Sequence, residues 1–203
     1  MRRSEPLTFL AMPVLLVGCG YQMSDHPPQR SAAASVSPSA TASAAPSAEP
    51  GVFTSQCSTG QLTVGLQGGR FSEPTGQHTV PLVINNISTN GCFRFGYPQV
   101  AFIDGAGHTI PFQYQTTGDQ VVTAAAPRHV DLVPHGLAYV TLNKYRCDLG
   151  DVMETSRVRL TPPGESASLD VAITDMPYCG RGDPGSVIHV SPIAATQLAT
   201  LSH

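Results

Sequence analysis

The sequence predicts an all-β domain over residues 56–203, an immunoglobulin-like β-sandwich stapled by two disulfides and preceded by a disordered linker. Three observations predict this fold. From Gln56 onward, short β-branched and aromatic runs alternate with Gly, Pro, Asn and Asp clusters. Four cysteines are spread over the same region, and the residues before it are dominated by Ser, Ala and Pro.

The first residues have the pattern of an export signal. Arg2 and Arg3 precede an apolar stretch, residues 7–16, which is too short to span a bilayer as a finished helix. A Leu-Val-Gly-Cys tetrapeptide then ends at Cys19, as in a bacterial lipobox, whose cysteine receives a diacylglyceryl group before the peptide is cut just ahead of it. We expect a lipoprotein signal peptide over 1–18 and lipid attachment at Cys19. The alternative is a plain signal peptide with an incidental cysteine, cut elsewhere.

The lipid is the expected membrane partner. A lipobox cysteine receives at least two acyl chains such as palmitate, which is enough for stable anchoring, whereas a single chain binds only marginally. The formal net charge of the chain is -3, so electrostatic binding to anionic lipid headgroups is not expected. The expected location is the outer face of the cell membrane, in the cell envelope.

Residues 19–55 form the expected lipidated N-terminus and tether. Within 31–50, 17 of 20 residues are Ser, Ala or Pro. This composition has no apolar periodicity and cannot bury enough surface to offset the entropy of the chain. A flexible coil of this length would hold the following domain roughly 30–36 Å from the membrane.

The domain itself is expected to contain nine strands. They are placed at residues 61–67, 79–87, 99–104, 108–114, 128–133, 136–144, 157–161, 168–174 and 186–191. Turn residues separate them, at 68–69, 74–76, 104–107 and 162–164. Alternating apolar triplets mark the core faces: Ile110, Phe112 and Tyr114; Ala138, Val140 and Leu142; Leu169, Val171 and Ile173.

The four domain cysteines allow three pairings. If 61–67 and 79–87 form an antiparallel hairpin, Cys57 and Cys92 lie at the same end of it. If 157–161 is the one returning strand between 136–144 and 168–174, Cys147 and Cys179 follow strands that run the same way. We therefore expect the disulfides Cys57–Cys92 and Cys147–Cys179. Because no C-x-x-C motif is present, a metal cluster or redox pair is disfavoured.

Several short motifs follow one another in a fixed order between about 56 and 192. They are PLVINNIS with Cys92 four residues after it, the GYP step into QVAFID, PHGLA at 134–138, and the Cys-Gly pair at 179–180. The order resembles the actinobacterial lipoprotein family catalogued as domain of unknown function 4232. The resemblance implies a secreted or lipidated β-sandwich and no activity. His135 interrupts the Pro-Gly pair usual in that family.

The composition excludes some function classes. Charged residues are only 12%, with 11 basic against 14 acidic side chains, so a nucleic-acid partner is not expected. Seven histidines are dispersed at positions 26, 78, 108, 129, 135, 189 and 203 without H-x-H spacing, which excludes Cu/Zn superoxide dismutase chemistry. Solvated or singly hydrogen-bonded histidines are favoured instead. No catalytic residue, metal ligand or cofactor is expected.

One acidic cluster and one aromatic cluster each have a structural and a functional interpretation. Asp148, Asp151 and Glu154 have the spacing of a helical face, so a short capped helical turn is favoured over a calcium site. Phe93, Phe95 and Tyr97 alternate after Cys92, and core packing is favoured over an exposed binding stripe.

Two tripeptides match known motifs. Residues 181–183 spell Arg-Gly-Asp, for which chance occurrence is favoured over adhesion. Residues 86–88 form an N-glycosylation sequon, which has meaning only in a host with that pathway.

The leading hypothesis is a non-enzymatic, membrane-anchored binding or interaction module of the cell envelope, whose ligand or protein partner is unknown. Loops 115–127 and 176–186 are the candidate binding loops, because such sandwiches bind through end loops. The alternative is an envelope hydrolase with a site assembled from scattered His, acidic and hydroxyl residues, around His129 or His135. A purely structural wall component without a pocket is the third class.

The lipobox predicts the effect of Cys19→Ala. The variant cannot be lipidated, so the precursor should remain uncleaved by the lipoprotein peptidase and leave the detergent phase on partitioning. Fractionation and intact mass measure both effects. Unchanged partitioning of the variant would show that something other than the lipid holds the protein.

Overall fold

A computed structural model describes residues 53–68, 74–150, 152–174 and 176–203. The expected signal peptide, Cys19 and the tether up to residue 52 lie outside the described residues, and so does Asp151. Within the described residues, no helix is long and apolar enough to cross a membrane.

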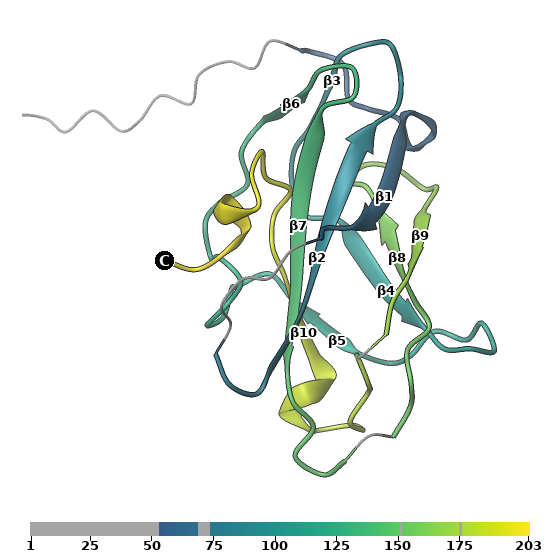
Figure 1. The fold of residues 1–203 in the computed structure, drawn as a ribbon, viewed down its shortest axis with the longest axis vertical. Helices are drawn as coiled ribbons and strands as arrows, with labels where there is room; N and C mark the ends of the chain where they lie inside the picture. Colours follow the sequence, from purple (N-terminus) through teal and green to yellow (C-terminus); the bar gives the residue numbers. More distant parts are fainter. Residues whose placement is uncertain (1–52, 69–73, 151, 175) are drawn as a thin grey trace, which may run out of the picture. The chain divides into compact units, whose positions relative to one another are not determined.

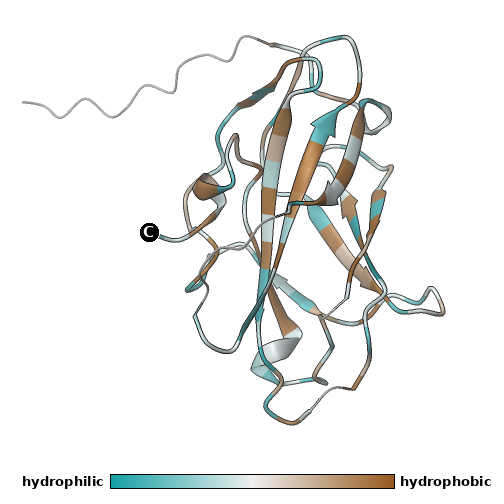
Figure 2. Ribbon diagram, viewed as in Figure 1, coloured by the Kyte–Doolittle hydropathy of each residue, from teal (hydrophilic) through white to brown (hydrophobic). Residues whose placement is uncertain are grey.

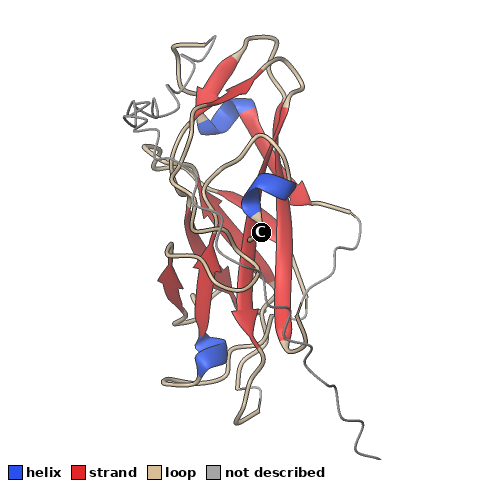
Figure 3. Ribbon diagram, turned by 90° about the vertical axis from the view of Figure 1, so that its left-hand side faces the viewer, coloured by secondary structure: helices blue, strands red, loops and turns tan. Residues whose placement is uncertain are grey.

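The described part of the chain is an all-β sandwich. Its ten strands are β1 (Leu62–Leu66), β2 (Gln77–Asn86), β3 (Cys92–Arg94), β4 (Gln99–Ile103), β5 (Gln113–Gln115), β6 (Val130–Leu132), β7 (Leu137–Tyr145), β8 (Arg157–Thr161), β9 (Leu169–Ala172) and β10 (Val187–Val190). Helical structure among these residues is limited to single 3-10 turns at Thr59–Gln61, Pro184–Ser186 and Leu198–Thr200, drawn in blue in Figure 3.

The strands form two main sheets and one separate two-stranded pair. The five-stranded sheet has the order β1-β2-β7-β10-β5, and the three-stranded sheet has the order β4-β8-β9. β3 pairs with β6. All pairings are antiparallel except that of β10 with the short edge strand β5. Figure 1 shows β2 and β7 side by side as the long strands of the first sheet, with β4, β8 and β9 behind and to the right.

The core lies between the sheets and is built by alternation. Leu82 on β2, Val140 on β7 and Ile188 on β10 point into it and are fully buried, as is Leu160 on β8. Figure 2 shows the alternation as bands of different hydropathy along β2 and β7. Because successive strand residues point to opposite faces, the same strands carry a second set of side chains away from the core.

Both predicted disulfides are confirmed. Cys57–Cys92 and Cys147–Cys179 span 35 and 32 residues, so each stabilises the fold by roughly 2–4 kcal/mol in the loop-entropy model. The hairpin of β1 and β2 is antiparallel as expected. β8 is antiparallel to β9, as the strand-direction argument for the second bridge requires, although both strands belong to the other sheet and do not pair with β7. That bridge links the loop after β7 to the segment before β10, and the strands of the other sheet lie between them in the sequence.

Two strand predictions need correction. The expected strand 108–114 is displaced, because Pro111 has no backbone N–H to donate. Thr109 bridges Ile103 next to the three-stranded sheet, and only Gln113–Gln115 reaches the five-stranded sheet as β5. β3 was not expected, since three residues directly after a turn give no periodicity to detect.

The helical turn expected at 148–154 is also wrong for the residues described there. The chain bends at Asp148 and then runs extended, with Met153 in a β-bridge to Tyr178. Glu154 is exposed on this extended segment. Gly150 has a φ of 97°, a left-handed conformation that breaks a helix.

His135 has a structural explanation. Residues 133–136 form a β-turn in which the N–H of Gly136 donates to the carbonyl of Val133 at 2.7 Å, with Pro134 at the second position. His135 at the third position has a φ of 60°. A type II turn requires this left-handed conformation there and normally places glycine in it. His135 thus replaces the expected glycine, and its side chain is exposed on the turn.

Asn86 holds the end of the sheet next to this turn. Its side chain is fully buried and its Nδ2 donates to the carbonyls of Asn90, Leu132 and Val133 at 2.8–3.2 Å. Its Oδ1 accepts from the N–H and hydroxyl of Ser88. The amide that a glycosylated sequon would expose is therefore engaged inside the fold.

Asn86→Ala should lower the free energy of unfolding by about 3 kcal/mol, because it leaves buried carbonyls without a donor. Asn85→Ala is the matched control. The neighbouring Oδ1 of Asn85 is buried without a partner, so its removal should cost about 1 kcal/mol or less. Urea unfolding measures both. Equal losses in the two variants would contradict the role assigned to Asn86.

Candidate functional site

The face of the five-stranded sheet that points away from the core is polar. The strand register places Thr79, Asn143, His189 and Gln115 in one row across β2, β7, β10 and β5. Gln77 and Tyr145 form a neighbouring pair on the same face. Such a row of hydrogen-bonding side chains arises because alternate residues of all four strands share this face.

Asn143 organises this face. It is fully buried, and its Nδ2 donates to Oε1 of Gln77 and to Oδ2 of Asp119, both at 2.6 Å. Its Oδ1 accepts from the hydroxyl of Thr79 at 2.8 Å. The oxygen of the Gln77 amide is thereby occupied, and its Nε2 has no partner among the described residues. Asn143 thus fixes which polar atoms of its neighbours stay available.

Asp119 is fixed from its other side by its own loop. Its Oδ1 accepts from the N–H groups of Val121 and Val122 at 2.8 and 2.6 Å. Gly118 precedes it with a φ of 75°, and a Cβ there would lie 2.7 Å from the backbone nitrogen of Ala124. Only glycine fits this position, so the loop presents Asp119 to Asn143 in one orientation.

Two adjoining hollows open on the polar face. The first has a volume of about 530 Å³ and the second about 310 Å³, and they share Pro184 and Val187. The first is lined by Pro111, Gln113, Tyr178, Arg181, Gly182, Asp183, Pro184, Ser186 and Val187. The second is lined by Gln77, Gln115, Asp119, Gln120, Tyr145, Pro184, Val187 and His189.

The two loops expected to carry binding line these hollows. Loop 176–186 supplies six of the residues around the first, and loop 115–127 supplies Gln115, Asp119 and Gln120 to the second. The parallel pairing of β5 with β10 brings the loops together, because it places the start of one loop beside the strand that follows the other. The two hollows therefore adjoin at the edge of the sheet.

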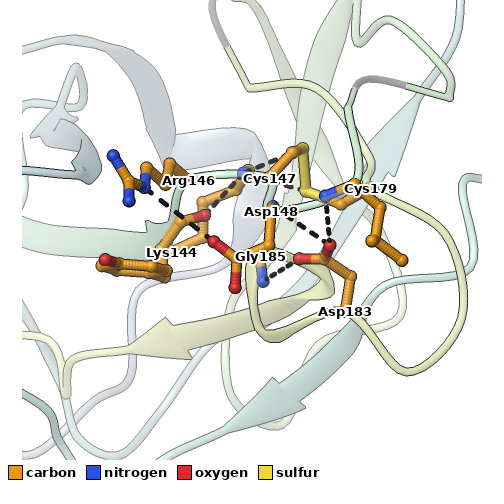
Figure 4. Close-up of polar contacts among 9 residues, drawn as sticks. Lys144, Arg146, Cys147, Asp148, Cys179, Asp183 and Gly185 are labelled. Carbon is orange, nitrogen blue, oxygen red and sulfur yellow. Dashed lines mark hydrogen bonds and ion pairs between the residues drawn. A yellow bond between two sulfur atoms is a disulfide. The ribbon is translucent and has the colours of Figure 1, made fainter.

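The first hollow rests on a buried carboxylate. Asp183 is 4% exposed, and its carboxylate accepts from the N–H groups of Gly185, Asp148 and Leu149 at 2.8–3.2 Å. Figure 4 shows this carboxylate between the 3-10 turn and the loop that follows Cys147. Because it is engaged inside the fold, Arg-Gly-Asp at 181–183 does not present the free carboxylate that an adhesion motif needs.

Several opposing effects act on the pKa of Asp183. Desolvation by burial favours a higher pKa, but the hydrogen bonds from Gly185, Leu149 and Asp148 and the nearby positive charge of Lys144 outweigh it and lower the pKa. The carboxylate is therefore ionised at neutral pH and acts as a fixed anchor of the loop.

His129, one centre of the alternative hydrolase site, contacts an aromatic ring and a carboxylate. His129 is half-buried, stacks on the ring of Phe93 at 4.2 Å and bonds to Oδ1 of Asp131 at 3.0 Å. The alternative hydrolase site would also need a hydroxyl nucleophile, and none is among these contacts of the His129 ring. The described part of the chain contains no group of three or more His, Cys, Asp or Glu side chains that could hold a metal ion.

The aromatic residues after Cys92 are not core residues. Phe93 is partly buried under His129, Phe95 is 52% exposed, and the hydroxyl of Tyr97 lies 3.4 Å from the carbonyl of Ala125. Core packing, favoured from their alternation, is wrong for Phe95. The short β3 ends at Arg94, so the alternation does not continue into a strand.

The sequence analysis proposed the two loops that line the hollows, but not the strand residues beside them. Gln77, Asn143 and His189 were not singled out, because polar residues at alternate strand positions are typical of a solvated face. A usable signal was Asn143 itself, an amide that with Lys144 follows the mainly apolar run Leu137–Leu142 of β7.

One family comparison matches the domain. The family model described as "Domain of unknown function (DUF4232)" matches residues 57–194, more than half of the chain. No curated protein and no solved structure matches.

Asp183→Asn should lower the thermal unfolding temperature by several degrees at pH 7, because the amide cannot accept all the bonds that the carboxylate accepts. The pKa of Asp183 is lowered in the fold, so its contribution is present above the ordinary aspartate pKa of about 3.9 and is lost as the pH falls through the lower folded value. The difference between wild type and variant should therefore shrink below about pH 4.

Asp148→Asn is the control, since that carboxylate is half-exposed and lies 3.9 Å from Arg146. It should leave the unfolding temperature nearly unchanged at every pH. If the difference in unfolding temperature between wild type and Asp183→Asn did not vary with pH, the anchoring role of the ionised carboxylate would be contradicted.

Proposed function

Since the chain belongs to the family described as Domain of unknown function (DUF4232), which assigns no activity, we propose from the geometry that it is a non-enzymatic binding module of the cell envelope. In this proposal a lipid on Cys19 holds it at the outer face of the cell membrane. Its ligand is a hydroxyl-rich oligosaccharide, which binds along the two hollows on the polar sheet face.

The pair of amide and carboxylate groups held by buried Asn143 is the observation that carries the proposal. Gln77 keeps its Nε2 as a donor and Asp119 keeps a lone pair on Oδ2 as an acceptor, both at the second hollow. A sugar hydroxyl is at once a donor and an acceptor, so neighbouring hydroxyls match such a pair. Holding the pair in place before binding lowers the entropy lost on binding.

The rest of the lining supports the same ligand class. Gln113, Gln115 and Gln120 are exposed neutral amides that can donate and accept, and the Tyr145 ring adds an apolar wall. Asp119 and Asp183 already accept several hydrogen bonds each, and Arg181 is the only cationic side chain around the first hollow. The surface thus lacks the clustered charge that a polyanion or polycation would need. Two adjoining hollows suit more than one sugar unit.

The test is a calorimetric titration of the lipidated chain in mild detergent with oligomers of glucose, mannose, arabinose and N-acetylglucosamine. At least one oligomer should bind saturably without being shortened. Gln77→Ala combined with Gln115→Ala should weaken that binding about tenfold or more, since two hydrogen bonds of about 1 kcal/mol each are lost.

Gln99→Ala is the matched control, because Gln99 is an exposed glutamine at the start of β4 in the other sheet. It should leave affinity unchanged. Absence of binding to every oligomer, or an equal loss in the control, would refute the proposed ligand class. Release of shorter saccharides would show an enzyme instead of a binding module.

A further inference from the structure

The single lysine of the chain is buried against a disulfide. Lys144 is fully buried, and its Nζ lies 3.5 Å from Sγ of Cys179 and 4.0 Å from Sγ of Cys147. The same Nζ donates to the carbonyl of Tyr145 at 2.8 Å. Figure 4 shows the amine between this carbonyl and the bridge. Its positive charge also acts on the carboxylate of Asp183.

The two sulfurs of this bridge differ in access. Cys179 is 2% exposed, whereas Cys147 is only partly buried, on the loop that follows β7. Of the two sulfurs, Sγ of Cys147 is therefore the one that we expect a nucleophile from solvent to attack, and the sulfur that leaves is the one nearest to Lys144. A cation next to a leaving thiolate lowers the pKa of that thiol and speeds its departure.

We propose that the Cys147–Cys179 bridge is a thiol–disulfide exchange site for an exposed dithiol. One thiolate of the dithiol attacks Sγ of Cys147, the S–S bond breaks, and its electron pair leaves on Sγ of Cys179 as a thiolate beside Lys144. The second thiolate of the dithiol then attacks the dithiol's own sulfur in the mixed disulfide. Cys147 leaves as a thiolate, the dithiol becomes a disulfide, and the protein holds two reduced cysteines.

This role does not require a C-x-x-C motif, because the protein is the substrate of the exchange and not its catalyst. The Cys57–Cys92 bridge of the same molecule differs from the Cys147–Cys179 bridge in burial and in the position of the neighbouring cation. Cys57 and Cys92 are both buried to 1% exposure or less. The nearest described cation, Arg94, donates to the backbone carbonyl of Cys57 and not to a sulfur.

Exchange would also affect the first hollow, a consequence that rests on the proposed function. The N–H groups of Asp148 and Leu149, directly after Cys147, hold the carboxylate of Asp183. Gly185 lies so close to the bridge that a Cβ there would be 2.5 Å from Sγ of Cys179. Opening the bridge should therefore loosen loop 176–186, whereas the exchange chemistry itself does not depend on any ligand.

The experiment treats the full lipidated chain in mild detergent with dithiothreitol under native conditions, followed by alkylation and peptide mass analysis over time. The Cys147–Cys179 pair should be reduced at least tenfold faster than Cys57–Cys92. Lys144→Met, which keeps the length of the side chain but removes the charge, should reduce that ratio about tenfold. Lys144→Arg should retain most of it.

A second measurement on the wild type covers the case in which the Lys144 variants fail to fold. After selective reduction, alkylation of Cys179 is followed as a function of pH. Its midpoint should lie below about 8.5, the ordinary cysteine pKa, because the thiolate is stabilised. Equal reduction rates of the two bridges, or a midpoint at or above the ordinary value, would overturn the proposal whether or not any saccharide binds.

Discussion

The pairing of β2 with β7 is the constraint on which the rest of the structure depends. It aligns nine residue pairs, from Gln77 with Tyr145 to Asn85 with Leu137, and β1 and β10 attach on either side. Because strand side chains alternate, a slip of one residue would move Asn143 into the core and Leu142 onto the polar face. The core and the candidate site are therefore two consequences of one register.

Polar contacts hold both ends of this register. At one end, Asn86 caps the carbonyls of Leu132 and Val133 beside the left-handed turn. At the other end, the N–H of Arg146 donates to the carbonyl of Gly76 at 2.7 Å, and a Cβ on Gly76 would lie 3.1 Å from the Tyr145 ring. Such polar contacts add specificity, most of all the buried ones of Asn86, since misalignment leaves them unsatisfied.

The long strands and both disulfides could be predicted from the sequence, because alternation over 79–87 and 136–144 is a local signal and the cysteines flank these strands. β3 and the displacement of β5 could not, since each depends on partners far along the chain. The same holds for the site. The C-terminal segment and loop 115–127 cover part of the polar face, through bridges such as Val122 with Leu201, so that Asn143 becomes buried. Polar residues at alternate strand positions are typical of a solvated face, so they gave no indication that these two segments would cover it.

Asn143 and Lys144 show how closely site and fold are linked. These consecutive residues are both fully buried and point to opposite faces of β7. Burying either polar group is costly without partners, and those partners come from loops distant in sequence: Asp119 for Asn143, and the Cys147–Cys179 bridge for Lys144. The two polar residues at the end of β7 therefore depend on loops 115–127 and 176–186 for their partners. The lining of the hollows and the end of the sheet therefore share these contacts, so a change in either loop also removes partners from buried groups of β7.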